Sequence, residues 1–312
     1  MRSPSSAFGR GAPLTPAPFS PVPSTDGVAV AVWALAGPDP SLPGARPSAN
    51  NGRPIVLCHA TGFHAGVWSP IARRLAGFRA FAPDLRGHGD TPAPTGRDMD
   101  WNGFADDVLA VVDAMTEAGV DTDSLVAAGH SKGGAALLLA EERRPGTFGA
   151  LYCYEPVVLP ADSGLAQGEK NPLAEGALRR RDTFESREAA YANYAGKLPF
   201  SALDPEALEA YVAHGFVDQP DGTVRLSCRP EIESAVYRMG GAHDAFAHLG
   251  EITCPVTIAT GAVDTFGPAA FAARIAEGIP DGHLVEYPDL GHFGPLEDPA
   301  RIASGIAEAL TA

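Results

Sequence analysis

Short apolar segments alternate with longer amphipathic segments along most of the chain. The short segments are continuously apolar or β-branched, which is typical of strands that are buried on both faces. In the longer segments apolar side chains recur at helical spacing, as Phe104, Val108 and Val111 do. Such alternation predicts an α/β fold with a mostly parallel sheet. The expected strands span residues 28–36, 54–60, 78–85, 125–129, 150–154, 256–260 and 284–287.

The alternation stops between residues 157 and 249. Ser186 and Asp204 are predicted to begin helices there, because both residue types are good N-caps, and a further helix is expected from about Pro230. Asp221 and the glycine after it predict a hairpin before that helix. An insert of this length between two strands of a sheet commonly covers a site. We therefore divide the chain into a core, residues 25–156 and 250–312, and an inserted, mainly helical cap, residues 157–249.

Residues 1–24 carry six prolines and two arginines but no acidic residue. Closely spaced prolines resist both helix and sheet, so we expect a disordered or extended arm. The segment lacks the apolar stretch of a secretory signal. Four cysteines in 312 residues do not make a disulfide scaffold, and a cytoplasmic location is therefore expected.

The acidic balance of the chain limits its partners. Its 38 acidic and 23 basic side chains give a net charge of −15, and such a surface repels phosphate backbones and anionic lipid. We expect a small-molecule substrate and neither nucleic-acid nor membrane partners, and we leave the oligomeric state open. The histidines and cysteines show no paired metal-ligand spacing, and no phosphate-binding glycine motif is present. The sequence therefore predicts no metal and no cofactor.

A candidate nucleophile lies in the pentapeptide GHSKG, which is centred on Ser131. This G-x-S-x-G sequence follows an expected strand and opens an expected helix over residues 132–143, which is the context of a nucleophile elbow. The turn is so tight that the serine takes a strained backbone conformation, and the two glycines leave room for the neighbouring strand and helix. We therefore predict that Ser131 is catalytic.

Two further segments resemble those of a known family. His59, Ala60 and Thr61 follow an expected strand, with Trp68 downstream, and are similar to an H-G-x-P stretch in which Ala60 stands where glycine is usual. The segment DLRGHGD, which begins at Asp84, resembles a D-x-R-G-x-G turn. Together with the serine turn, these motifs make the chain resemble an α/β-hydrolase with a cap domain, from about residue 28 to the end. The resemblance implies a mostly parallel central sheet flanked by helices, with an inserted cap.

The same resemblance implies a catalytic triad in the chain order serine, acid, histidine. His292, just after the last expected strand, is then the base. Asp264 matches the family's G-x-x-D-x-x-x-P pattern and is the expected acid, while Glu155, after the preceding strand, is the alternative. The oxyanion hole is expected to consist of the backbone N–H groups of Lys132 and Thr61.

The implied activity is hydrolysis of a carboxylic ester, or of a lactone or thioester, of a small molecule through an acyl-enzyme. Epoxide hydrolases and haloalkane dehalogenases share the layout but carry an aspartate at the elbow, so the serine disfavours both. Three alternatives stay open: cleavage of a C–C bond next to a ketone by the same triad, lyase chemistry of the hydroxynitrile type, and a ligand-binding sensor with an idle triad.

Lys132 stands where esterase relatives commonly carry an apolar residue. Glu155 ends the strand that is expected beside the elbow strand, so the two side chains are predicted to converge behind Ser131. An unpaired ammonium in a partly buried site is costly, and a neighbouring carboxylate removes most of that cost. We hypothesise a Lys132–Glu155 ion pair at the floor of the site, which either holds the elbow or lets Lys132 receive a carboxylate or carbonyl of the substrate.

Overall fold

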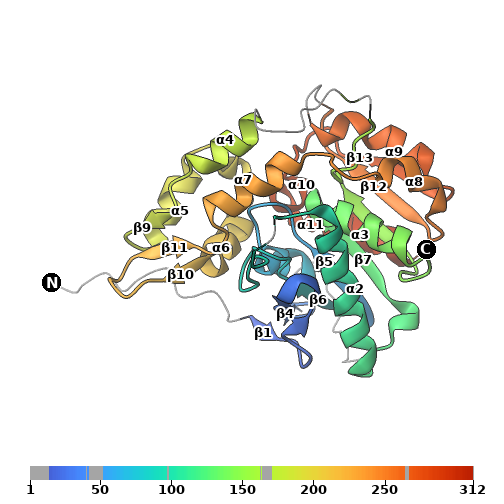
Figure 1. The fold of residues 1–312 in the computed structure, drawn as a ribbon, viewed down its shortest axis with the longest axis horizontal. Helices are drawn as coiled ribbons and strands as arrows, with labels where there is room; N and C mark the ends of the chain where they lie inside the picture. The colour runs from blue at the N-terminus through green and yellow to red at the C-terminus, as the bar shows by residue number, and fades with distance from the viewer. Residues whose placement is uncertain are drawn as a thin grey trace.

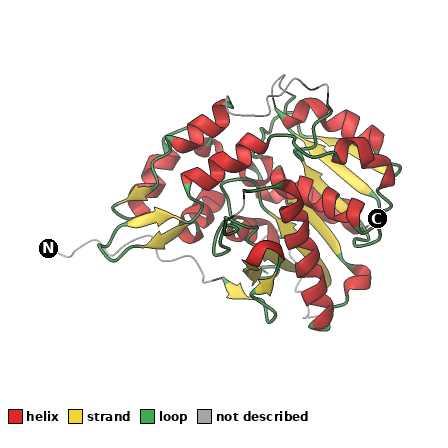
Figure 2. Ribbon diagram, viewed as in Figure 1, coloured by secondary structure: helices red, strands yellow, loops and turns green. Residues whose placement is uncertain are grey.

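An eight-stranded sheet forms the centre of the molecule (Figures 1 and 2). The structure is a computed structural model that describes residues 14–39, 41, 52–96, 98–161, 163, 171–263 and 267–311. The strand order is β1-β4-β6-β5-β7-β8-β12-β13; β4 is antiparallel to both of its neighbours, and every other adjacent pair is parallel. The predicted α/β fold is thereby confirmed. The strands are β1 Thr15–Pro16, β4 Val32–Ala34, β5 Arg53–Cys58, β6 Phe78–Pro83, β7 Val126–His130, β8 Leu151–Tyr154, β12 Val256–Thr260 and β13 Gly282–Glu286, and a separate ribbon holds β2 Val22–Pro23 and β3 Ala29–Val30.

Side chains of the central strands are buried on both faces of the sheet. Along β5, Ile55 and Leu57 point into one apolar cluster and Val56 and Cys58 into another, because successive side chains of a strand alternate. Helices α2, α3 and α9 cover the cluster around Val56, and α1 and α11 cover the other. The edge strand β13 is largely exposed, so the two-sided burial expected of it is wrong. The core helices are α1 Ser69–Ala72, α2 Trp101–Glu117, α3 Lys132–Arg143, α9 Ala272–Gly278, α10 Gly294–Glu297 and α11 Pro299–Thr311, with short 3₁₀ turns η1 Thr25–Gly27, η2 Ala65–Trp68, η3 Thr122–Ser124 and η6 Pro268–Phe271.

The proline-rich N-terminal segment packs against the core from residue 14 onward. β1 pairs with β4, and β2 pairs with β3. The Ser24 hydroxyl donates a hydrogen bond of 2.6 Å to the carboxylate of Asp107 on α2. Of the two states expected for residues 1–24, disordered or extended, residues 14–24 take the extended one and are anchored to the core. Residues 1–13 lie outside the described part of the chain.

The insert between β8 and β12 folds into helices and a small sheet of order β10-β11-β9; α4, α5, α6 and this sheet group together at the left of Figure 1, whereas α8 lies at the right, beside α9. Ser186 caps α5 and Asp204 caps α6 by accepting backbone N–H groups, as predicted. The hairpin of β10 and β11 turns around Asp221, and α7 begins at Pro230, also as predicted. None of the described helices is both long and apolar enough to cross a bilayer. The insert contains α4 Pro172–Leu178, β9 Thr183–Phe184, α5 Arg187–Ala195, η4 Phe200–Ala202, α6 Pro205–His214, β10 Phe216–Asp218, β11 Val224–Leu226, α7 Pro230–Met239, α8 Ala245–His248 and η5 Leu249–Glu251.

Candidate active site

Ser131 occupies a strained turn between β7 and α3. Its φ is 54° and its ψ is −114°, a region that side-chain-bearing residues rarely adopt. A Cβ on Gly129 would lie 2.6 Å from the backbone of Gly133, and one on Gly133 would lie 2.1 Å from the carbonyl oxygen of Cys58. Only glycine fits at either position, because the end of β7 lies against the start of α3 at Gly129, and the start of α3 lies against β5 at Gly133.

Ser131 begins a continuous hydrogen-bonded series of three side chains. Its Oγ lies 3.2 Å from Nε2 of His292, and Nδ1 of His292 lies 2.6 Å from Oε2 of Glu155. Since an ionised carboxylate can only accept, Nδ1 of His292 carries the proton and Nε2 is free to accept from the serine hydroxyl. This arrangement can increase the nucleophilicity of a serine oxygen by removing its proton during attack.

Glu155 follows β8, whose last residues pair with the end of the elbow strand β7. The glutamate side chain is 2% exposed. Its second oxygen, Oε1, accepts hydrogen bonds from the Gly261 N–H at 2.8 Å and from the Thr260 hydroxyl at 3.3 Å. The end of β12 therefore holds the carboxylate in place, and the three donors compensate the cost of burying its charge.

The structure brings together Ser131, His292 and Glu155 among the candidates from the sequence. Asp264, the acid that the sequence favoured, lies outside the described residues. Glu155 was the alternative, and its signal in the sequence is its place directly after the strand beside the elbow strand. The sequence favoured Asp264 because its spacing matches the family's G-x-x-D-x-x-x-P pattern, although both carboxylates follow strands that end at the same edge of the sheet.

The loop of His292 is tied to the strands beneath it. Nε2 of His130 lies 2.7 Å from the carbonyl oxygen of His292, and because a carbonyl can only accept, this Nε2 donates. The hydroxyl of Tyr154 donates to the carbonyl of Gly291 at 2.8 Å. Burial and the neighbouring His292 lower the pKa of His130 well below its usual value. His130 therefore serves as a neutral donor that positions the backbone of the candidate base.

The two N–H groups predicted to form an oxyanion hole are free to donate. Neither the N–H of Thr61 nor that of Lys132 has an acceptor among the described residues. The loop of Thr61 is held by His59, whose Nδ1 donates to the Ala60 carbonyl at 2.8 Å and whose Nε2 accepts from the Leu85 N–H at 3.0 Å. Alanine at position 60, where glycine is usual in the family, therefore leaves both ring nitrogens of His59 hydrogen-bonded.

The predicted Lys132–Glu155 ion pair is wrong. Nζ of Lys132 lies 3.3 Å from both ring nitrogens of His88 and 4.6 Å from the ring centre of Phe104. Glu155, within the described part of the chain, bonds only to its three partners given above. The lysine at the first position of α3 extends toward α2, whereas Glu155 turns toward His292. Lys132 is fully buried, and this burial lowers its pKa to about 7.

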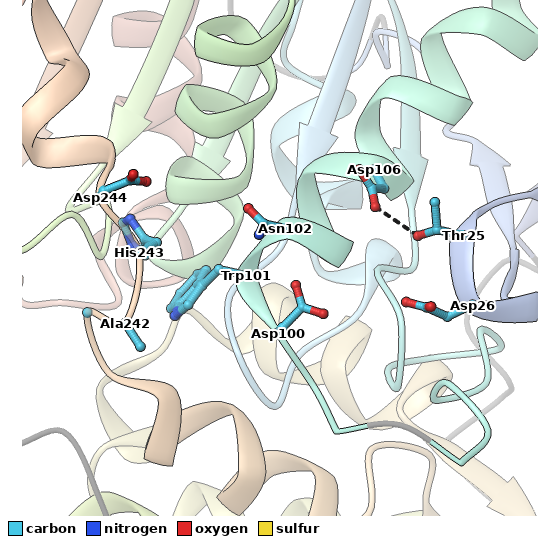
Figure 3. Close-up of a pocket in the computed structure, with 10 residues that line it drawn as sticks. Thr25, Asp26, Asp100, Trp101, Asn102, Asp106, Ala242, His243 and Asp244 are labelled. Atoms are coloured by element: carbon cyan, nitrogen blue, oxygen red, sulfur yellow. Dashed lines mark hydrogen bonds between the residues drawn. The ribbon is translucent and has the colours of Figure 1, made fainter.

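Two other features of the molecule resemble binding sites. A cavity of about 840 Å³ lies between η1, the start of α2 and the segment before α8 (Figure 3). Its carboxylates are already engaged: Asp106 accepts from Thr25, as Figure 3 shows, and Asp100 caps α2. Elsewhere, carboxylate oxygens of Glu142 and Asp244 and a ring nitrogen of His248 lie within 4.8 Å of one another. Residues of these types can bind a metal cation. A hydrogen bond of 2.9 Å joins His248 to Glu142 and raises the pKa of that histidine, so the group also satisfies itself as an ion pair.

Comparison with known proteins shows which family the chain belongs to. A family model described as the alpha/beta hydrolase family matches residues 55–304. Lipase LipV of Mycobacterium tuberculosis is 26% identical over 258 residues, which cover 82% of this chain and 92% of that protein. The pimeloyl-[acyl-carrier protein] methyl ester esterase of Aromatoleum aromaticum is 28% identical over 269 residues, covering 82% of this chain and 97% of that protein. The crystal structure of E-2-(acetamidomethylene)succinate hydrolase matches with a TM-score of 0.70 at 20% identity, covering 91% of this chain and 96% of that one. Because the family model spans most of its length, the chain belongs to the alpha/beta hydrolase family.

Proposed function

We propose that the chain is a serine hydrolase that cleaves a carboxylic ester of a small molecule through an acyl-enzyme. The observation that carries this proposal is the continuous series from Ser131 Oγ to His292 Nε2 and from His292 Nδ1 to Glu155 Oε2, at 3.2 and 2.6 Å. In it Glu155 replaces Asp264 as the acid of the triad. A serine with a base in reach, and a base oriented by a third group, is the arrangement that nucleophilic catalysis needs.

The first half of the reaction forms the acyl-enzyme. Oγ of Ser131 attacks the ester carbonyl carbon while Nε2 of His292 takes the hydroxyl proton. Glu155 holds the Nδ1–H and stabilises the imidazolium. The N–H groups of Thr61 and Lys132 donate to the oxyanion that develops, and losing one such donor costs on the order of 3 kcal/mol in barrier height. His292 then returns the proton to the departing alcohol as the C–O bond breaks.

The second half removes the acyl group. His292 takes a proton from water, the hydroxide oxygen attacks the acyl carbon, and the bond to Ser131 Oγ breaks as that oxygen regains the proton from His292. The products are a carboxylic acid, an alcohol and the free enzyme. The α3 helix, which begins at Lys132, adds the positive end of its dipole near the oxyanion in both halves.

The relatives support the ester bond as the target. The names of the two curated relatives, a lipase and a methyl ester esterase, both denote ester hydrolysis. Each is similar to this chain along most of its length, and the esterase function is carried over from them as part of the proposal.

A fluorophosphonate probe and a short p-nitrophenyl ester test the proposal together. We expect the probe to label the wild-type protein and not Ser131→Ala, and the ester to be hydrolysed by the wild type only. No labelling of Ser131 would contradict the proposed mechanism and favour a sensor with an idle triad. Labelling without hydrolysis of any carboxylic ester would contradict the proposed bond and favour cleavage next to a ketone.

A further inference from the structure

A buried ion pair lies against the candidate oxyanion loop. Arg180, just after α4, donates from Nη1 to Oε2 of Glu233 on α7 at 2.8 Å. A Cβ on Gly62 would lie 2.7 Å from Glu233 Oε1 and 3.4 Å from Arg180 Nη1. Gly62 directly follows Thr61, whose N–H is a candidate oxyanion donor. The pair therefore borders the reaction centre from the side of the insert.

Aromatic rings connect this pair with the candidate base. The Arg180 guanidinium lies 5.4 Å from the ring centre of Phe200, and the ring of Phe200 stacks on Phe63 at 5.9 Å. The ring centre of Phe63 lies 5.6 Å from that of Phe293. The ring of Phe293 contacts the His292 ring edge-on, with 5.3 Å between the ring centres. These aromatic contacts form a continuous apolar connection with the candidate base at one end and the polar pair at the other.

Both partners of the ion pair keep unused hydrogen-bonding capacity. Nη2 of Arg180 donates to the hydroxyls of Tyr194, at 3.2 Å, and of Tyr211. Its Nε–H and the second hydrogen of Nη1 have no acceptor among the described residues, and Oε1 of Glu233 has no donor among them. Both side chains keep some contact with solvent, since 15% of the Arg180 side chain and 8% of the Glu233 side chain are exposed. The pair therefore offers free donors and a free acceptor side by side.

We infer that the Arg180–Glu233 pair recognises a neutral substituent that both donates and accepts, such as a hydroxyl group, on the substrate; this rests on the ester hydrolysis proposed above. A hydroxyl can donate to Glu233 Oε1 and accept from a free N–H of Arg180 at once. A carboxylate would satisfy the arginine alone and would place a second negative charge beside Glu233, which already compensates the guanidinium. An alkyl group would cover both partners and satisfy neither.

Three methyl esters that differ only in their terminal group test this inference: methyl 6-hydroxyhexanoate, monomethyl adipate and methyl heptanoate. Binding is measured by calorimetry in Ser131→Ala, where no turnover is needed, and kcat/KM in the parent. We expect the hydroxy ester to bind at least about tenfold more tightly than the other two. Adding Glu233→Gln leaves the arginine charge uncompensated, so monomethyl adipate should gain about tenfold in affinity, and the advantage of the hydroxy ester over it should shrink by that factor. Glu231→Gln, an exposed change on the same helix, should alter none of the three affinities.

Several results would overturn the inference. Equal binding of the three esters, or preferred binding of monomethyl adipate by the parent, would show that the pair does not select a hydroxyl group. A Glu233→Gln variant that weakens all three equally would assign the pair to packing of the insert. If that variant does not fold, the binding order of the parent decides alone. If the hydroxy ester binds best to Ser131→Ala and yet the parent hydrolyses none of the esters, ester hydrolysis fails as the function while the polar subsite stands.

Discussion

Two buried titratable side chains next to the elbow are treated in opposite ways. The carboxylate of Glu155 receives donors from His292, Gly261 and Thr260. The amine of Lys132 has no carboxylate within ion-pair distance among the described residues and lies over the rings of His88 and Phe104. The fixed donors around Glu155 compensate the cost of burying its negative charge. Lys132 has no such compensation, and burial lowers its pKa to about 7. In the proposed mechanism this contrast separates two roles: the carboxylate of Glu155 orients the base, and Lys132 contributes its backbone N–H.

The largest effect is expected from the nucleophile and the base. Ser131→Ala and His292→Ala should each lower turnover by about 10⁶-fold, and the double variant should be little worse than either, because the residues act as a unit. Steady-state turnover of an ester substrate measures this. A His292→Ala variant that keeps a tenth of wild-type turnover would show that another group is the base.

The acid comes next. Glu155→Gln keeps the shape of the side chain, but its amide oxygen is still held by the Gly261 N–H, so its amide N–H is turned toward Nδ1 of His292. This donor favours the imidazole tautomer with the proton on Nε2, which cannot accept from Ser131, so turnover should fall by about 10⁴-fold with little change in melting temperature. Asp264→Asn is the matched change at the position that the sequence favoured, and it should stay within a few-fold of the wild type. The reverse pattern would assign the acid to Asp264.

Lys132 should behave as an uncompensated amine. Its pKa is about 7 in the folded protein and 10.5 ordinarily, so between these values the unfolded chain holds a proton that the folded chain has released. Stability should therefore rise with pH across that window, and at pH 6 the buried ammonium should cost roughly 3–5 kcal/mol. Lys132→Met removes this cost and should be more stable than the wild type at pH 6, with the gain shrinking by pH 10.

Urea unfolding at the two pH values measures this difference. Lys197→Met, at an exposed lysine, is the matched control and should change neither stability nor its pH dependence. A Lys132→Met variant that is less stable than the wild type at pH 6 would mean that the ammonium has a compensating partner, and the contrast with Glu155 would fail.

The smallest effect on stability is expected from removing one of the several hydrogen-bond donors to the buried carboxylate of Asp107. Asp107 accepts from Nε and Nη2 of Arg86, from the Arg86 N–H and from the Ser24 hydroxyl. Ser24→Ala removes one of these donors and should lower the free energy of unfolding by only about 1 kcal/mol. A loss several times larger would show that the N-terminal segment, and not the arginine, compensates this carboxylate.

Much of the fold could be predicted because it depends on local patterns. The strand over residues 256–260 and the helix over residues 132–143 have the bounds that the sequence predicted. N-cap residues such as Ser186 located helices of the insert, since a cap is a short-range interaction. The structure of the proline-rich segment was harder to predict from the sequence. Prolines disfavour regular strand pairing, yet residues 14–24 pair with β4 and form a hydrogen bond to α2.

The parts of the site that depend on long side chains were not predictable in the same way. A lysine at the start of a helix can extend in several directions, and packing against His88 and Phe104 decides which one it takes. Arg180 and Glu233 meet only because α4 and α7 pack together over Gly62, and no spacing in the sequence reports that contact. Backbone motifs therefore located the candidate nucleophile and the candidate base, while their side-chain partners required the tertiary structure.

The central claim is that the carboxylate of Glu155 accepts the Nδ1–H of His292. Proton NMR of the protein, labelled with ¹⁵N at histidine and recorded at low temperature, observes that proton directly and needs no substrate. The account predicts a far-downfield resonance coupled to an imidazole nitrogen in the wild type and in Asp264→Asn, and its loss in Glu155→Gln and in His292→Ala. A resonance that survives in Glu155→Gln and disappears in Asp264→Asn would contradict the account and make Asp264 the partner of the base.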